Sequence, residues 1–121
     1  MFAYAVKNRI ETFRLGEVTE KGYVGKIIRG IVHERITSDF AKNTIYPTCE
    51  NAFRTRDDDK TPVGLWQGEF WGKWIISACL AAEYTDDNEL RDFLGKCAHG
   101  LISSADGNGY IGTYKNSLDV F

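Results

Sequence analysis

The segment from Gly68 to Tyr84 constrains the fold most, because its apolar side chains surround a helix on nearly every side. At helical spacing one face carries Phe70, Trp74, Ala78 and Ala81, and another carries Trp71, Ile75, Cys79 and Ala82. A helix that is apolar all round must be covered by other elements on several sides. The sequence therefore predicts a covered central helix over residues 68–84 in a mainly α-helical protein.

Two further segments have the periodicity of amphipathic helices. Apolar residues recur every three or four positions between residues 23 and 36, and again between 90 and 102. Asp86, with Glu89 three residues later, has the pattern of an N-cap and capping box. Because few residues separate the helix that follows from the helix over 68–84, we expect an antiparallel helical hairpin.

Residues 37–65 show no clear periodicity, and we expect a long irregular loop there. A small compact domain rarely carries such a loop unless it serves a function or contacts something else. The chain has 121 residues, 43% of them hydrophobic and 26% charged, which suits one globular domain. This composition excludes collagen-like, low-complexity and wholly disordered classes.

Charge and cysteine content give further expectations about partners and cellular location. The net charge is −2, without a basic stripe, so we expect no nucleic-acid partner. The longest nearly apolar run, residues 74–82, is too short to cross a membrane, and we expect no membrane association. Three cysteines and no signal-peptide pattern indicate reduced thiols and a cytoplasmic location. Cys79 and Cys97 fall within helical patterns, so we expect both to be buried and inert.

Most motifs of catalysis are missing from the sequence. It contains no H-E-x-x-H, Walker or G-x-S-x-G pattern. Residues 107–112 match G-x-G-x-x-G, but a dinucleotide site needs a preceding strand and a following helix. The expectation here is a helix stop and a tight turn. The acidic run at residues 57–59 is flanked by basic residues and is expected to be a solvated loop, not a metal site.

The stretch over residues 65–74 is the best candidate for a binding site. Trp66 and Glu69 lie before and in the first turn of the central helix. An aromatic face beside a carboxylate suits sugar recognition, because the apolar face of a sugar ring stacks on an indole while its hydroxyls need acceptors. Simple packing is the alternative for both residues, and it is favoured for Trp71 and Trp74.

Four blocks of the sequence resemble the start of the β-L-arabinofuranosidase-like glycoside hydrolases. These blocks are LGEVTEKGYV at 15–24, GEFWGKW at 68–74, AAEYTDDNEL at 81–90 and NGYIGTY at 108–114. Each block is short, but their order and spacing agree with the family over about residues 13–114. The family's turn usually has Asp where this chain has Asn108.

The resemblance implies that residues 1–121 are the N-terminal portion of a single (α/α)₆ toroid. Family members are several times longer, and their retaining mechanism resembles one with a cysteine nucleophile held by zinc and a glutamate acid/base. Those motifs lie beyond this length, so no catalytic residue, metal ligand or cofactor is assigned here, although zinc is expected in a longer parent. Trp66, Glu69 and Tyr110 are the expected contacts to a carbohydrate substrate, and the isolated chain is expected to be inactive.

A different class of function fits the same sequence. In this alternative the chain is a non-enzymatic helical module that self-associates or binds a partner through the helix over 68–84. A third hypothesis is that the chain belongs to another helical-toroid carbohydrate enzyme, such as an unsaturated-uronide hydrolase or a lyase.

Overall fold

The computed structural model describes residues 12–58 and 66–114 of the chain. All regular structure in these residues is helical, as the sequence predicts, and they contain no strand. The elements are α1 (Gly22–Ile31), the π-helical turns η1 (Val32–Ile36) and η2 (Ala41–Ile45), α2 (Tyr46–Arg54), α3 (Gln67–Thr85) and α4 (Asn88–Ile102). No helix of the described part is long and apolar enough to cross a membrane.

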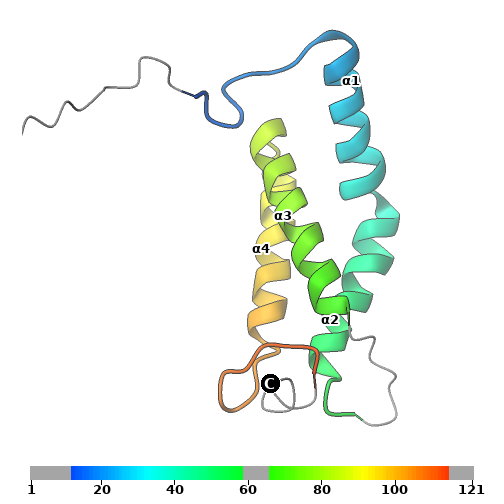
Figure 1. The fold of residues 1–121 in the computed structure, drawn as a ribbon, viewed down its shortest axis with the longest axis vertical. Helices are drawn as coiled ribbons and strands as arrows, with labels where there is room; N and C mark the ends of the chain where they lie inside the picture. The colour runs from blue at the N-terminus through cyan, green and yellow to red at the C-terminus, as the bar shows by residue number, and fades with distance from the viewer. Residues whose placement is uncertain (1–11, 59–65, 115–121) are drawn as a thin grey trace, which may run out of the picture.

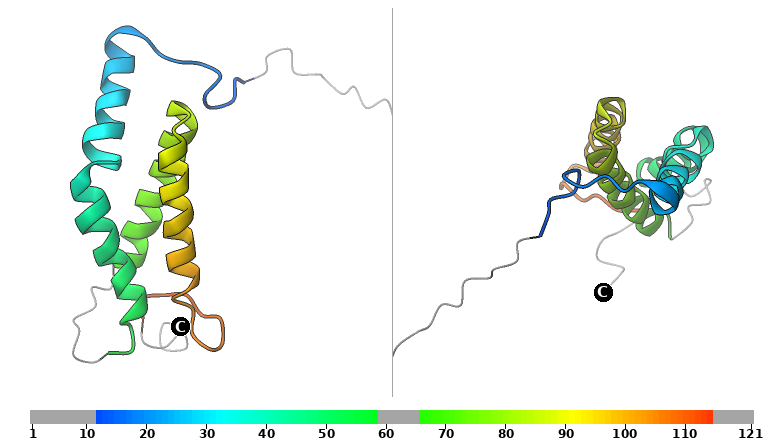
Figure 2. Two further views of the ribbon diagram at one scale, coloured as in Figure 1. Left: turned by 180° about the vertical axis from the view of Figure 1, so that it is seen from behind. Right: turned by 90° about the horizontal axis from the view of Figure 1, so that it is seen from above.

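The helices form two arms that meet at one end (Figure 1). One arm runs from α1 through η1 and η2 into α2, and the other consists of α3 and α4 side by side. α2 packs against both α3 and α4, and η1 packs against α3. At the opposite end α1 stands apart from α3 and α4, which is clearest from above (Figure 2). We call the end with α2 the base and the end with α1 the open end.

The helix expected over residues 68–84 is present as α3, but it is covered on only part of its circumference. Ala78, Ala81 and Ala82 are buried, and their small side chains let η1 and α4 approach closely. The opposite side of the helix remains open, where Ile76 is 63% exposed and Leu80 53%. The described helices therefore cover only part of the apolar surface of α3.

Aromatic packing at the centre of the molecule joins the two arms. Tyr46 of α2, Trp74 of α3 and Phe93 of α4 form a cluster with ring centroids 5.3 to 6.1 Å apart. The indole Nε1 of Trp74 also donates to the backbone oxygen of Ile36 at 2.9 Å. Trp74 therefore holds the long arm against α3 through both packing and a hydrogen bond.

The expectation of an irregular loop over 37–65 was wrong for residues 41–54, which form η2 and α2. Pro47 lies in the first turn of α2, where it lacks the N–H that would bond to the carbonyl of Asn43. The wider turn η2 lies directly before it. This break in the regular hydrogen-bond pattern hides the periodicity of Tyr46, Cys49 and Phe53, all buried on one side. Residues 59–65 of the expected loop lie outside the described residues.

The predicted cap of α4 was displaced by one residue. Asp87, not Asp86, is the N-cap, and its side chain accepts from the backbone N–H of Leu90 at 3.0 Å. Asp86 instead adopts the left-handed conformation, with φ of 54°, and ends α3. A short polar side chain tolerates this conformation better than most, so Asp86 makes the turn and Asp87 makes the cap.

The cysteines also depart from expectation. Cys97 is buried as predicted, but Cys79 is exposed. It lies on the uncovered side of α3, where the sequence pattern predicts burial that no described element provides.

Candidate functional site

The residues at the start of α3 line a hollow at the base of the molecule. Trp66 and Glu69 both line this hollow, which has a volume of about 370 Å³. Its other walls are Phe53 from α2, Gly68 from α3 and residues 111–114 from the segment after α4. The structure therefore brings Trp66 and Glu69 to one surface, together with a part of the chain that follows them by more than forty positions.

Tyr110 does not line this hollow. Its ring faces the guanidinium carbon of Arg56, 5.5 Å from the ring centroid. Its hydroxyl lies over Gly112, where a Cβ would collide with it. Tyr114, four residues later, lines the hollow instead. Tyr114 is the last residue of the 108–114 block, and this position was the one signal in the sequence that could have identified it as a residue of the hollow.

Two further wall residues were missed by sequence reasoning. Phe53 lies in the helix that the sequence pattern concealed, and Thr113 is buried beside Gly68. A Cβ at Gly68 would stand 3.5 Å from both the Phe53 ring and the Thr113 side chain. These are ordinary van der Waals distances, so α2 and the 111–114 segment both pack closely on the start of α3 at this position.

Glu69 supplies the carboxylate of the hollow and pairs with Lys73 one turn along α3. Both side chains are substantially exposed, so the pair contributes little to stability. A carboxylate has about four acceptor positions, and Lys73 engages one oxygen. Glu69 therefore retains the capacity to accept hydrogen bonds from hydroxyl groups.

A tight turn shapes the wall opposite α3. The side chain of Asp106 accepts from the backbone N–H groups of Tyr110 at 2.9 Å and Asn108 at 2.8 Å. These bonds hold the pKa of Asp106 below its usual value, because they favour the charged carboxylate. Gly109 has φ of +83°, and its N–H donates to the backbone oxygen of Asp106. The helix stop and turn expected for this segment are therefore present.

Arg56 connects this turn to the rest of the base. It is only 8% exposed, and its Nη1 donates to the backbone oxygens of Phe53 at 2.6 Å and Ser104 at 2.7 Å. The Phe53 carbonyl belongs to the last turn of α2, where a helix leaves acceptors unpaired, and the Ser104 carbonyl lies just after the C-cap of α4. Together with its contact to Tyr110, Arg56 fixes the distance between α2, α4 and the turn.

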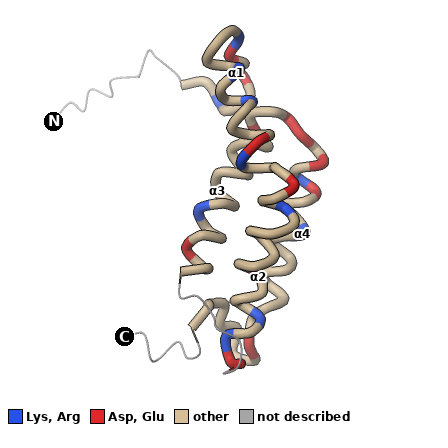
Figure 3. Tube along the Cα trace, turned by 90° about the vertical axis from the view of Figure 1, so that its right-hand side faces the viewer, with Lys and Arg blue, Asp and Glu red and all other residues tan. Residues whose placement is uncertain are grey.

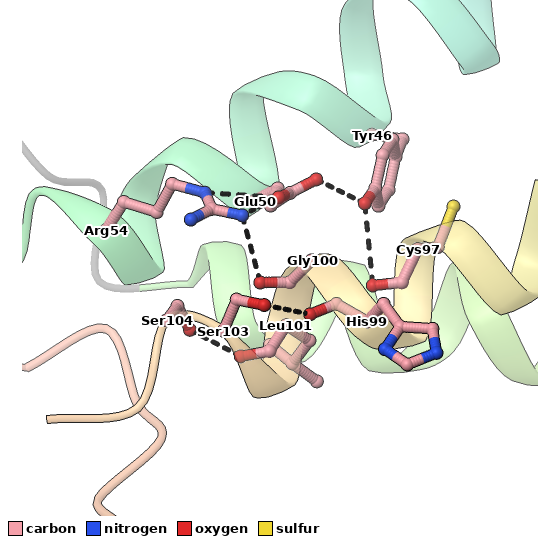
Figure 4. A network of polar contacts seen from close by, with 9 residues as sticks. All are labelled: Tyr46, Glu50, Arg54, Cys97, His99, Gly100, Leu101, Ser103 and Ser104. Atoms are coloured by element: carbon pink, nitrogen blue, oxygen red, sulfur yellow. Dashed lines mark hydrogen bonds and ion pairs between the residues drawn. The ribbon is translucent and has the colours of Figure 1, made fainter.

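A second polar cluster at the base is structural (Figure 4). The hydroxyl of Tyr46 donates to Glu50, while Nη2 of Arg54 donates to Glu50 Oε1 at 2.6 Å and to the oxygen of Gly100 at 3.0 Å. Burial opposes the charge of Glu50, but the hydrogen bonds from Tyr46 and Arg54 outweigh it and lower the pKa of the carboxyl. Burial, together with the hydrogen bonds that the Tyr46 hydroxyl makes to Glu50 and Cys97, raises the pKa of Tyr46. The cluster ties α2 to α4 and opens onto no hollow described above.

The described residues offer no basis for a bound zinc ion. They contain no group of three or more His, Cys, Asp or Glu side chains placed to hold a metal. Cys49 and Cys97 are buried among apolar side chains, and burial raises the pKa of both thiols, which disfavours the thiolate that metal binding needs. Lys and Arg are interspersed with Asp and Glu along the described chain (Figure 3).

Comparison with known proteins gives no assignment: no family model matches the sequence, and no curated protein or solved structure is significantly similar to it.

Proposed function

We propose that this chain is the N-terminal part of a glycoside hydrolase that acts on arabinofuranoside-type plant glycans. In this proposal the helices form the first layers of an (α/α)₆ toroid, and the hollow at the base is part of the substrate rim. The catalytic residues of the retaining mechanism, and any zinc ion, belong to a longer parent.

The observation that carries the proposal is the composition of the hollow. Trp66, which is 65% exposed, lines it together with Tyr114, which is 39% exposed, and with the partly exposed carboxylate of Glu69. Two aromatic faces and a carboxylate are what a sugar ring needs: apolar surface for its C–H face and an acceptor for its hydroxyls. The buried Arg56 and the Asp106 turn make this wall rigid before a ligand arrives.

The test is a titration of the ¹⁵N-labelled chain with a methyl arabinofuranoside, up to about 50 mM, because rim contacts alone are expected to bind in the millimolar range. We expect the indole N–H resonance of Trp66 to shift while those of Trp71 and Trp74, which lie in the core, stay in place. The Trp66→Ala variant should lose the binding.

Phe70→Ala is the matched control for that variant. Phe70 is also an exposed aromatic residue near the start of α3, but it does not line the hollow, so its loss should leave the titration unchanged. Absence of any shift, or loss of binding in Phe70→Ala as well, would contradict the assignment of the hollow. Release of arabinose by the isolated chain would contradict the placement of the catalytic residues elsewhere.

The uncovered side of α3 favours a second candidate function, a helical module that binds a partner or another copy through this helix. Ile76 and Leu80 on this side are both more than half exposed. If α3 is the binding surface, replacing Ile76 and Leu80 together by Ser should abolish complex formation, and Trp66→Ala should have no effect on it.

A further inference from the structure

A pocket at the open end is lined by side chains that each carry a polar group. It has a volume of about 440 Å³ and lies where the segment of residues 12–20 crosses toward α1 (Figure 1). Its lining residues are Thr19, Arg29, His33, Tyr84, Thr85 and Asp87. The neighbouring groove between α1, η1 and α3 is instead lined mainly by aliphatic side chains. The fold therefore gathers polar groups from α1, η1, the end of α3 and the α3–α4 turn at one place.

Backbone hydrogen bonds hold three of these side chains in position. The N–H of Glu20 donates to the hydroxyl of Tyr84 at 3.2 Å, and Nη1 of Arg29 donates to the carbonyl oxygen of Glu20 at 3.4 Å. Oδ1 of Asp87 accepts from the N–H of Leu90 at 3.0 Å, as the N-cap of α4. The pocket is therefore formed by the fold itself, as most small-molecule sites are.

These side chains retain hydrogen-bonding capacity toward a ligand. A guanidinium has five N–H donors, and Glu20 engages one of those of Arg29. The hydroxyl of Tyr84 accepts from Glu20 and can still donate its own proton, while Oδ2 of Asp87 remains an acceptor. The imidazole of His33 adds ring nitrogens from η1.

The pocket contains two side chains of opposite formal charge that do not pair with each other. Within the described residues, neither Arg29 nor Asp87 forms an ion pair. The adjacent carboxylate of Asp86 is already paired with Arg91 at 2.8 Å. A simple anion in the pocket would be attracted by Arg29 and repelled by Asp87, and a simple cation would meet the reverse. A ligand that carries both charges can engage both side chains at once.

From this arrangement we propose that the pocket at the open end binds a small zwitterion of the free amino-acid class. Arg29 and the Tyr84 hydroxyl hold the carboxylate of the ligand, and Asp87 holds its ammonium group. Thr19 and Thr85 offer oxygens to a polar side chain of the ligand. A neutral polyol would leave the opposite charges without charged partners, so the pocket differs in kind from the hollow at the base.

The test is a titration of the ¹⁵N-labelled chain with L-serine, up to about 100 mM and near neutral pH. We expect shifts of the amide resonances of the residues that line the pocket, and none at the hollow of the base. Arg29→Gln and Asp87→Asn should each weaken binding about fivefold or more, because each removes a charged hydrogen-bond partner. Asn caps a helix about as well as Asp, so Asp87→Asn leaves α4 intact.

Arg35→Gln and Asp92→Asn are the matched control variants. They make the same changes at exposed residues outside the pocket, so both should bind serine like the wild type. Two altered ligands separate the two charges: L-serine methyl ester lacks the carboxylate, and N-acetyl-L-serine lacks the ammonium group. Each should bind about fivefold or more weakly than serine.

Three results would overturn the proposal. The first is the absence of any shift at about 100 mM serine. The second is undiminished binding of one altered ligand: N-acetyl-L-serine with tighter binding by Asp87→Asn identifies a site for simple anions, and the methyl ester with tighter binding by Arg29→Gln identifies a site for simple cations. The third is a shift of the same resonances with a methyl arabinofuranoside, which identifies a polyol site.

Discussion

The base and the open end of the molecule contain the same kinds of helices but bury their apolar residues to very different extents. At the base, Phe53 and Trp71 are both less than a tenth exposed and pack edge-to-face at 6.2 Å. At the open end the buried residues of α3 are alanines, while the larger residues of α1 remain near half exposed. Large side chains of α2 and α3 therefore hold the base together, whereas those of α1 remain partly in contact with solvent at the open end.

The polar contacts of the base and the open end differ in the same direction. The base has Arg56 bonded to the end of α2 and to the residue after the C-cap of α4, and it has the Tyr46–Glu50–Arg54 cluster between α2 and α4. At the open end, the N–H of Glu20 donates to the hydroxyl of Tyr84 at 3.2 Å and joins the start of the arm to α3. We infer that α1 opens at lower free energy than α2, because fewer buried contacts must be broken.

The largest expected effect compares one substitution in two environments. Phe53→Ala removes a ring that is 6% exposed and should destabilise the chain by about 3–5 kcal/mol, since it leaves a cavity in the base. Phe70→Ala removes a ring that is 56% exposed and should cost less than about 1 kcal/mol. Urea unfolding of both variants measures the difference, and equal costs would show that the Phe70 ring is covered in solution.

Two glycines on α4 give a smaller effect of opposite sign. A Cβ at Gly100 would collide with the Glu50 carboxylate, so Gly100→Ala should displace Glu50 from Tyr46 and Arg54 and destabilise by about 1–2 kcal/mol. A Cβ at Gly95 meets nothing, and Gly95→Ala should stabilise by up to about 1 kcal/mol through helix propensity. If both variants were stabilised, Glu50 would not be tied into the cluster as described.

Sequence reasoning succeeded where a helix has a single continuous apolar period. The helices over 23–36, 68–84 and 90–102 were predicted closely. Trp66 and Glu69, which lie within one turn of each other, line the same hollow. The helix α2 was missed because Pro47 and the turn η2 interrupt its hydrogen bonding. The helix continues past this interruption because α2 packs against α3 and α4. A local sequence pattern contains no information about such long-range packing.

The absence of long-range contacts from a local pattern also explains why the N-cap of α4 and the aromatic lining of the hollow differ from expectation. Asp86 and Asp87 are chemically identical candidates for the cap, and the geometry of the α3–α4 connection decides between them. Tyr110 and Tyr114 are likewise similar, but the buried Arg56 draws Tyr110 away and leaves Tyr114 at the hollow. Contacts between residues more than fifty positions apart therefore determine which aromatic residue lines the site.

Acid should weaken the base through Glu50. The folded state lowers the pKa of this carboxyl, so its contribution to stability is present above the usual value of 4.5 and is lost as the pH falls through the lower folded value. The free energy of unfolding of the wild type should therefore decline below about pH 4.5, and Glu50→Gln should show a shallower decline over the same range. Parallel curves for the two proteins would mean that Glu50 does not titrate differently in the folded state.

The smallest expected effect distinguishes two neighbouring residues of α1. Ile28 packs against the core and Ile27 does not, so Ile28→Ala should cost about 1–2 kcal/mol and Ile27→Ala less than about 0.5 kcal/mol. Thermal unfolding of both variants measures the difference. Equal costs would mean that Ile27 and Ile28 are covered to the same extent in solution.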